Sequence, residues 1–347
     1  MKEIIVDAYG GDNAPFEIVK GAIEFLNKHN NFNIVLVGNE NELNSVLSKF
    51  SYQKDRLRII DAKEIISNNE SPTTAIRTKK NSSIVKAFDE LRLNDNCVGF
   101  VSAGSTGAVL TGAFLKLGRI KGISRPATCP ILPTLNGGYV AIIDSGANVD
   151  CKPINLVHFA LMANAYMKYV YGVKNPRISL LNVGVEDHKG NELTHQTFEM
   201  LKSIKDINFV GNMEARDLFS GDVDVVVCDG FNGNVLLKSS EGAVKFVLKS
   251  LKSGIQKSFF SKLGALFMGK TFKTLKQKLD YSSYGGAIML GTKKVVVKCH
   301  GSSLSESIHG AIVQVAQASD ANLCDVIENN VSKYGEINEW NWNNIKP

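Results

Sequence analysis

Short apolar segments alternate with longer amphipathic segments along most of this 347-residue chain. The short segments are rich in valine and isoleucine and are apolar throughout, unlike half-exposed strands; they occupy 3–8, 33–38, 97–103, 138–144, 177–184, 222–230 and 293–299. Such strands are expected where helices cover both faces of a mostly parallel sheet. The pattern therefore predicts an α/β fold with three layers, α/β/α.

Polar and small residues follow five of these predicted strands. The sets are Asp7 with Gly10 and Gly11, Ser102 with Gly104, Asp144 with Gly146, Asp229 with Gly230, and His300 with Gly301. Because ligands bind outside the carboxyl ends of strands in open α/β sheets, we expect these loops to meet at one cleft. No fixed repeat, linker or low-complexity tract divides the chain, so we expect one catalytic domain over 1–347.

The segment 240–280 has a different pattern, with apolar residues at helical spacing in two runs that meet near Gly264. We expect a protruding helical hairpin within the domain. Residues 264–271 read GALFMGKT and match the P-loop pattern, but they follow a lysine-rich helix instead of a buried strand. We therefore interpret them as part of the hairpin tip, whose apolar residues are Phe259, Phe260, Leu263, Leu266, Phe267 and Met268.

Charge is concentrated in the same segment. The chain has 40 basic and 34 acidic residues, and nine lysines lie within 245–278, where no Asp, Glu or Arg occurs. Without those nine lysines, 31 basic residues face 34 acidic ones, a balance of −3. Basic amphipathic helices favour anionic membrane surfaces or acidic partners. A dimer interface with a solvated lysine face is a compatible alternative, and no nucleic-acid partner is expected.

Targeting and metal signals are missing from the sequence. The six cysteines form no C-x-x-C pair, which predicts reduced thiols in the cytoplasm and no metal site. Residues 144–153 lack the spacing of a calcium loop. The first residues do not have the pattern of a signal peptide, and no apolar run is long enough to span a bilayer, so we expect no export and only peripheral membrane contact.

Several loops carry residues suited to binding an anion or stabilising a negative charge. The hydroxyls and small residues of 102–108 can form an anion site, and the loop 298–303 adds a histidine and two serines. Lys189 can supply a fixed positive charge and Asn234 a neutral hydrogen-bond donor. Taken one at a time, these residues could also be helix caps or ordinary surface side chains.

Seven loops considered together are more informative: DAYGGDNAP, SAGSTGA, IDSGANVDCKP, EDHKGNELTHQTF, CDGFNGNVLLKSSEG, DYSSYGGAIMLG and KCHGSS. In this order and over nearly the whole chain, they resemble the phosphate acyltransferase family of bacterial phospholipid synthesis. The resemblance implies a fold similar to that of phosphate acetyltransferases and isocitrate/isopropylmalate dehydrogenases. It also implies a homodimer with a protruding helical hairpin.

The resemblance further implies a reaction in which inorganic phosphate attacks the thioester of fatty acyl-acyl carrier protein. The products would be free carrier protein and acyl phosphate, which a separate glycerol-phosphate acyltransferase would use; no cofactor is implied. Lys189 and Asn234 match positions that the family uses in catalysis. We expect phosphate or substrate binding by Asp7, Gly10, Gly11, Asp12, Ser102, Gly104, Ser105, Thr106, Asp144, Asn148, Asp229, His300, Ser302 and Ser303.

We expect the hairpin to contact acyl carrier protein or the inner face of the cell membrane, which would place the protein in the cytoplasm and peripherally on the membrane. Three alternatives remain open at this point. They are a phosphate acetyltransferase acting on acyl-CoA, a nicotinamide-dependent dehydrogenase on the related fold, and a non-enzymatic scaffold at the membrane surface.

Overall fold

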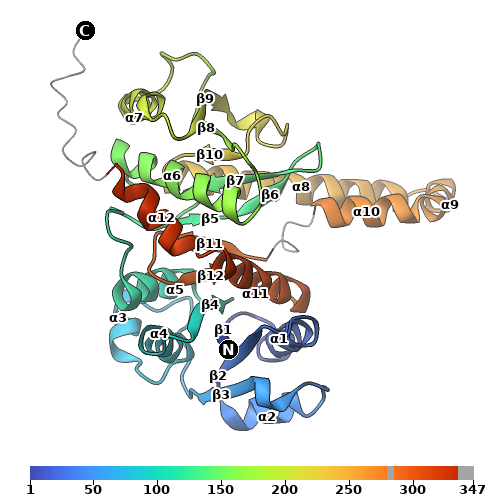
Figure 1. Ribbon diagram of the computed structural model, residues 1–347. Coiled ribbons are helices and arrows are strands. Elements are labelled where there is room, and N and C mark those ends of the chain that lie inside the picture. The colour runs from blue at the N-terminus through green and yellow to red at the C-terminus, as the bar shows by residue number, and fades with distance from the viewer. Residues whose placement is uncertain (280–284, 335–347) are drawn as a thin grey trace.

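The strands form two sheets in the computed structural model, which describes residues 1–279 and 285–334 (Figure 1). The first sheet has the order β3-β2-β1-β4-β12-β11-β5, spanning Leu57–Asp61, Phe32–Gly38, Lys2–Asp7, Cys97–Ser102, Val295–Lys298, Ala287–Leu290 and Ala127–Cys129. The pairs β12-β11 and β11-β5 are antiparallel, and the other pairs are parallel. Residues 280–284 of the loop DYSSYGGAIMLG and 335–347 of the expected domain lie outside the described ranges.

The second sheet has the order β6-β7-β10-β8-β9, spanning Ile131–Pro133, Tyr139–Ile143, Val225–Val227, Arg177–Asn182 and Asn208–Glu214. Its edge strand β6 is antiparallel to β7, and the remaining pairs are parallel. The predicted α/β fold with mostly parallel strands is thus confirmed, with the strands divided between two sheets.

Helices cover both faces of the first sheet. Successive side chains of a strand point to opposite faces, so a strand of this sheet is apolar on both. In β1, Ile4 and Val6 pack with α1 (Phe16–Lys28) and α11 (Ser305–Asp320). Ile5 packs on the other face with α3 (Pro72–Thr78), α4 (Ser83–Leu93) and α5 (Thr106–Gly112). This explains why the strand is apolar at each of these positions.

A single hydrophobic cluster joins the two sheets. It includes Ile4 of the first sheet, Val225 of the second, and the buried Tyr166 of α6 (Pro153–Tyr169). The remaining elements are α2 (Glu40–Leu47), α7 (Glu192–Ser203), α12 (Leu323–Ser332) and the short turns Lys54–Arg56, Ala113–Leu117 and Ala215–Asp217. The shared cluster thus connects the two sheets, and the organisation of 1–347 as one domain stays a prediction.

Three helices form an arm that extends from the body of the protein (Figure 1). They are α8 (Gly230–Gln256), α9 (Phe259–Phe267) at the far end, and α10 (Gly269–Leu279). The expectation of two helices meeting near Gly264 is wrong, because Gly264 lies inside α9. The chain instead breaks before α9, where the Ser258 side chain caps the new helix. In the part of the chain that the structure describes, no helix is both long enough and apolar enough to cross a bilayer.

Candidate active site

A cleft of about 830 Å³ lies where loops of both sheets meet α8. Much of its wall comes from loops at the carboxyl ends of β1, β3, β4, β7 and β12, as expected for an α/β protein. Of the residues predicted to bind substrate or act in catalysis, those that line the cleft are Gly11, Asp12, Gly104, Ser105, Thr106, Asn234, His300 and Ser303.

Hydrogen bonds fix the three loops of the first sheet to one another. The backbone N–H of Asp12 donates to the carbonyl of Gly301 at 2.8 Å, and that of Cys299 donates to the carbonyl of Ser102 at 2.9 Å. The side-chain amide of Asn13 donates to the carbonyls of Ser302 and Ser303 at 3.2 and 3.3 Å. The fold therefore brings together three loops that are distant in the sequence.

Asp7 supports these loops from below and does not line the cleft. It is 1 % exposed and accepts a 2.7 Å hydrogen bond from Ser102 Oγ, which in turn accepts one from the N–H of Gly104 at 3.0 Å. Burial raises the pKa of Asp7, against the opposing effect of the Ser102 hydrogen bond. A Cβ at Gly10 would lie 2.6 Å from the Gly104 nitrogen, so this close packing requires glycine.

Lys298 is a cleft residue that the sequence reasoning missed. It ends β12, lines the cleft, and donates to the carbonyl of Cys299. Burial lowers its pKa, and the nearby Asp7 and Asp12 partly oppose that effect. The available signal was a lysine at the end of an apolar strand, immediately before the predicted histidine loop.

His300 and Ser303 lie on the loop that follows Lys298. Ser302 donates to His300 Nδ1 through its backbone N–H at 3.2 Å, and its Oγ lies 2.8 Å from the same nitrogen. Nδ1 therefore acts as an acceptor, which places the proton of neutral His300 on Nε2. Burial, followed by nearby Lys238, lowers the His300 pKa. Ser303 Oγ is buried and has no hydrogen-bond partner among the described residues.

Asp144 organises the loop after β7. It is completely buried and accepts hydrogen bonds from the backbone and hydroxyl of Thr128, from the N–H groups of Gly146 and Ala147, and from both the backbone and side chain of Asn148. Neither Asp144 nor Asn148 lines the cleft, whereas Ser145 and Gly146 do. The carboxylate therefore shapes the wall of the cleft from behind.

The first turns of α8 bring Asn234 into the cleft. Asp229 caps the helix by accepting from the backbone and side chain of Asn232 at 2.8 and 2.6 Å. A Cβ at Gly233 would lie 1.9 Å from the Asp144 carbonyl oxygen, so glycine lets α8 approach the loop after β7. The side chain of Asn234 is exposed and makes no hydrogen bond to a described residue, which leaves its amide available to a ligand.

The structure places Lys189 on the loop after β8, exposed and outside the residues that line the cleft. The loop is held by a hydrogen bond from the Asn182 side chain to the Lys189 carbonyl at 2.9 Å. Because β7, β10 and β8 are parallel neighbours, this loop lies at the same edge of the second sheet as the N-terminus of α8. Its catalytic role stays a prediction.

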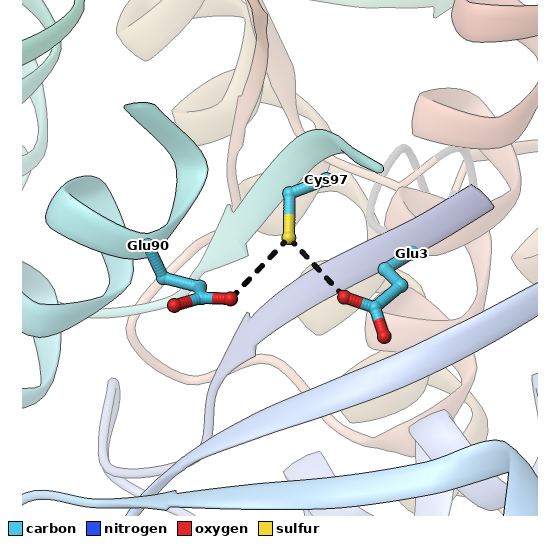
Figure 2. A group of neighbouring side chains, drawn as sticks. All are labelled: Glu3, Glu90 and Cys97. Carbon is cyan, nitrogen blue, oxygen red and sulfur yellow. Dashed lines mark hydrogen bonds between the residues drawn. The ribbon is translucent and has the colours of Figure 1, made fainter. Parts of the chain in front are cut away.

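Glu3, Glu90 and Cys97 are the one group of possible metal ligands that lie close together within 1–279 and 285–334 (Figure 2). Arg58 already supplies a cation there, since its Nη2 lies 2.7 Å from Glu3 and 2.6 Å from Glu90. The Arg58 hydrogen bond holds the pKa of Glu3 below its usual value, and burial raises the pKa of Cys97 to about 12. Glu3 and Cys97 lie near the starts of β1 and β4, whereas the cleft lies at the strand ends, so we interpret the group as structural.

Solved structures define the class to which this fold belongs. The chain is similar to a phosphotransacetylase from Streptococcus pyogenes, with a TM-score of 0.60, 15% identity, and 92% of this chain and 94% of that chain covered. It is also similar to the EutD phosphotransacetylase from Staphylococcus aureus, with a TM-score of 0.59, 14% identity and the same coverage. At such identities the likeness establishes the phosphotransacetylase-like fold alone.

Sequence comparisons identify the family. The model of the family described as "Fatty acid synthesis protein" matches residues 2–326. The phosphate acyltransferase of Clostridium perfringens is 46% identical over 338 residues, covering 97% of this chain and 99% of that protein. The phosphate acyltransferase of Halothermothrix orenii is 46% identical over 334 residues, with 96% and 99% covered. The chain therefore belongs to the phosphate acyltransferase family and is an acyltransferase.

Proposed function

We propose that this enzyme transfers a fatty acyl group from acyl carrier protein to inorganic phosphate. The observation that carries the proposal is the group of hydrogen-bond donors and lysines around one cleft. It includes the Ser303 hydroxyl and the Asn234 amide, which have no hydrogen-bond partner within 1–279 and 285–334. Such groups suit an anionic nucleophile and a negatively charged transition state. The membership of the phosphate acyltransferase family supports the same reaction.

Phosphate binds, in this proposal, between the loop after β4 and the loop after β12. Ser105, Thr106 and Ser303 offer hydroxyls there, and Lys298 offers positive charge. Asp7 and Ser102 hold the first of these loops from below, as their hydrogen bond indicates. Of the remaining predicted residues, Gly10, Gly11 and Asp12 form the adjacent loop after β1, and Ser302 belongs to the loop after β12. Asp229 caps α8.

The acyl carbonyl would then face α8. A phosphate oxygen attacks the thioester carbon, a C–O bond forms, and the C–S bond breaks. The proton of hydrogen phosphate ends on the carrier thiol, which leaves acyl phosphate as the other product. Asn234 stabilises the oxyanion through its amide, and Lys189, on the loop after β8 at the same edge of the second sheet, provides positive charge.

No acyl-enzyme intermediate is needed because phosphate is already an anionic nucleophile. Cys299 is the cysteine that lines the cleft, but burial raises its pKa to about 12. The reactive thiolate is therefore scarce at neutral pH. This supports direct attack by phosphate over transfer through the enzyme.

The arm supports the proposal of a carrier-protein and membrane contact. All six predicted tip residues are exposed, Phe267 by 85 % and Phe260 by 81 %. The arm also carries lysines on α8 and α9, and their positive charge suits an acidic carrier protein or an anionic inner leaflet. We further propose a cytoplasmic homodimer that binds the membrane peripherally and passes acyl phosphate to a glycerol-phosphate acyltransferase.

The test is to incubate the protein with palmitoyl-acyl carrier protein, with and without inorganic phosphate, and to trap acyl phosphate with hydroxylamine. We expect released carrier thiol to match trapped hydroxamate and to require phosphate. If folded enzyme releases no thiol from this donor but does so from acyl-CoA, the phosphate acetyltransferase alternative replaces the proposal.

A further inference from the structure

A second, smaller hollow of about 170 Å³ opens beside the cleft, between the edge of the second sheet and the arm. Its walls are mostly apolar and come from Leu132, Leu135, Phe219, Leu237, Val244 and Leu275. We call it the apolar groove. Leu275 belongs to α10 and Val244 to α8, so both long helices of the arm contribute to it.

The apolar groove is continuous with the cleft, because Leu132, Leu237 and Glu241 line both. On α8, the residues that face these two spaces run from Asn234 through Leu237 and Glu241 to Val244 at helical spacing. At a rise of 1.5 Å per residue, that face is about 15 Å long.

Polarity changes along this face of α8. Asn234 and Lys238 stand at the cleft end, and Lys238 pairs with the buried Glu241 at 3.0 Å. Beyond Glu241 the lining is Val244 of α8 and Leu275 of α10, opposite Leu135 and Phe219. A ligand that fits this gradient has a polar reacting group at one end and a hydrocarbon tail at the other.

We infer that the apolar groove binds the hydrocarbon chain of the acyl donor, which the proposed function assumes, while its carbonyl lies beside Asn234. The tail then runs along α8 toward the arm. The observation that selects this occupant is the continuity of the groove with the cleft: the tail leads directly from the carbonyl into apolar surroundings. Burial of its methylene groups there favours long-chain donors over short-chain ones.

Val244→Trp tests the inference because Val244 lines the groove and not the cleft. The measured quantity is the ratio of kcat/KM for palmitoyl-carrier protein to that for butyryl-carrier protein. Displacing two methylenes of the long chain should lower this ratio roughly 15-fold. Both donors carry the same carrier protein, so a change in carrier docking cancels in the ratio.

Val247→Trp is the matched control, since Val247 is an exposed residue of the same helix that lines neither space. It should leave the ratio unchanged. An unchanged ratio in a folded Val244→Trp enzyme overturns the inference. If that variant instead alters the oligomeric state and leaves the ratio intact, the groove is a contact between protomers and the inference is again wrong.

Photocrosslinking tests the same inference without a substitution. The probe is carrier protein loaded with a fatty acyl chain that has a diazirine at its end, irradiated with unaltered enzyme in the absence of phosphate. Adducts are expected at 132–135, at Phe219 or at 240–244; adducts confined to other segments contradict the inference. Failure of the proposed function is distinct, because unaltered enzyme would then make no acyl phosphate from acyl-carrier protein of either chain length.

Discussion

The loop after β7 and the tip of the arm differ in how many contacts their side chains make with the rest of the protein. Asp144 is fully buried, and its carboxylate accepts hydrogen bonds from the backbone and side chains around it. Phe267 at the tip is 85 % exposed. The first region is held in one arrangement before any ligand arrives, whereas the second presents apolar surface that gains only from a partner. Binding chemistry and docking are thus built in separate parts of the molecule.

The largest expected effect concerns the Asn234 amide, which lies on α8 beside the loop after β7 and has no hydrogen-bond partner among the described residues. Asn234→Ala should lower kcat about 100- to 1000-fold, as the loss of one oxyanion donor does. Because this side chain makes no hydrogen bond to a described residue, thermal unfolding should stay close to that of the unaltered enzyme. Lys189→Ala is the companion variant. Near-normal turnover in both folded variants would remove the assignment of the two residues to catalysis.

The pH dependence of stability tests whether the buried His158 is neutral in the folded protein. His158 Nδ1 accepts hydrogen bonds from the N–H of Ser124 at 3.3 Å and from its hydroxyl at 2.9 Å. Burial lowers the His158 pKa from 6.5 to about 4. As the pH falls, His158 therefore becomes protonated in the unfolded chain before it does so in the folded protein. The free energy of unfolding consequently decreases between pH 6.5 and pH 4, by about 3 kcal/mol in total.

Urea unfolding at a series of pH values measures this contribution. His158→Gln should lack it, so its free energy of unfolding should fall less steeply between pH 6.5 and 4. Equal slopes in the two proteins would contradict a neutral, buried His158.

A smaller effect is expected for Ser303, on the loop after β12 where we propose that phosphate binds. Its buried hydroxyl has no partner among the described residues, so Ser303→Ala should leave the free energy of unfolding the same or slightly higher. The KM for phosphate should rise roughly ten- to hundredfold, since a hydrogen bond to a charged group is lost. A loss of stability with unchanged phosphate KM would show that the hydroxyl serves the fold alone.

The smallest expected effect concerns the arm. Phe267→Asp should weaken sedimentation with anionic liposomes by roughly tenfold or more, because one exposed aromatic side chain no longer inserts. Turnover of soluble substrate should change little. Phe246→Asp on the stem is the control, since Phe246 is 72 % exposed but lies away from the tip. Equal losses in both variants would argue against a specific role of the tip.

Sequence patterns predicted the floor of the cleft because loops after parallel strands must meet at one edge. This reasoning placed Ser105, Asn234 and His300 at one site. It could not separate residues that face a ligand from residues that hold the loops, because Asp12 and Asp144 look alike as acidic residues in loops after strands. Only the hydrogen bonds show that the Asp144 carboxylate is occupied by donors of Thr128 and Asn148.

Other features depended on long-range packing that local patterns do not encode. Lys298 reads as the last residue of a strand, and its place in the cleft follows from the pairing of β12 with β4. The division of the strands into two sheets likewise depends on which strands become neighbours. The third helix of the arm was missed because the spacing of apolar residues does not mark the break before α9, where the Ser258 side chain caps the helix.

The central claim is direct attack of phosphate on the bound thioester, and a single-turnover experiment tests it most directly. Enzyme in excess is mixed with palmitoyl-carrier protein without phosphate, and both released thiol and enzyme mass are followed before phosphate is added. The account predicts no thiol release and no mass gain until phosphate arrives. A phosphate-independent burst of thiol with an acyl adduct on the enzyme would contradict it.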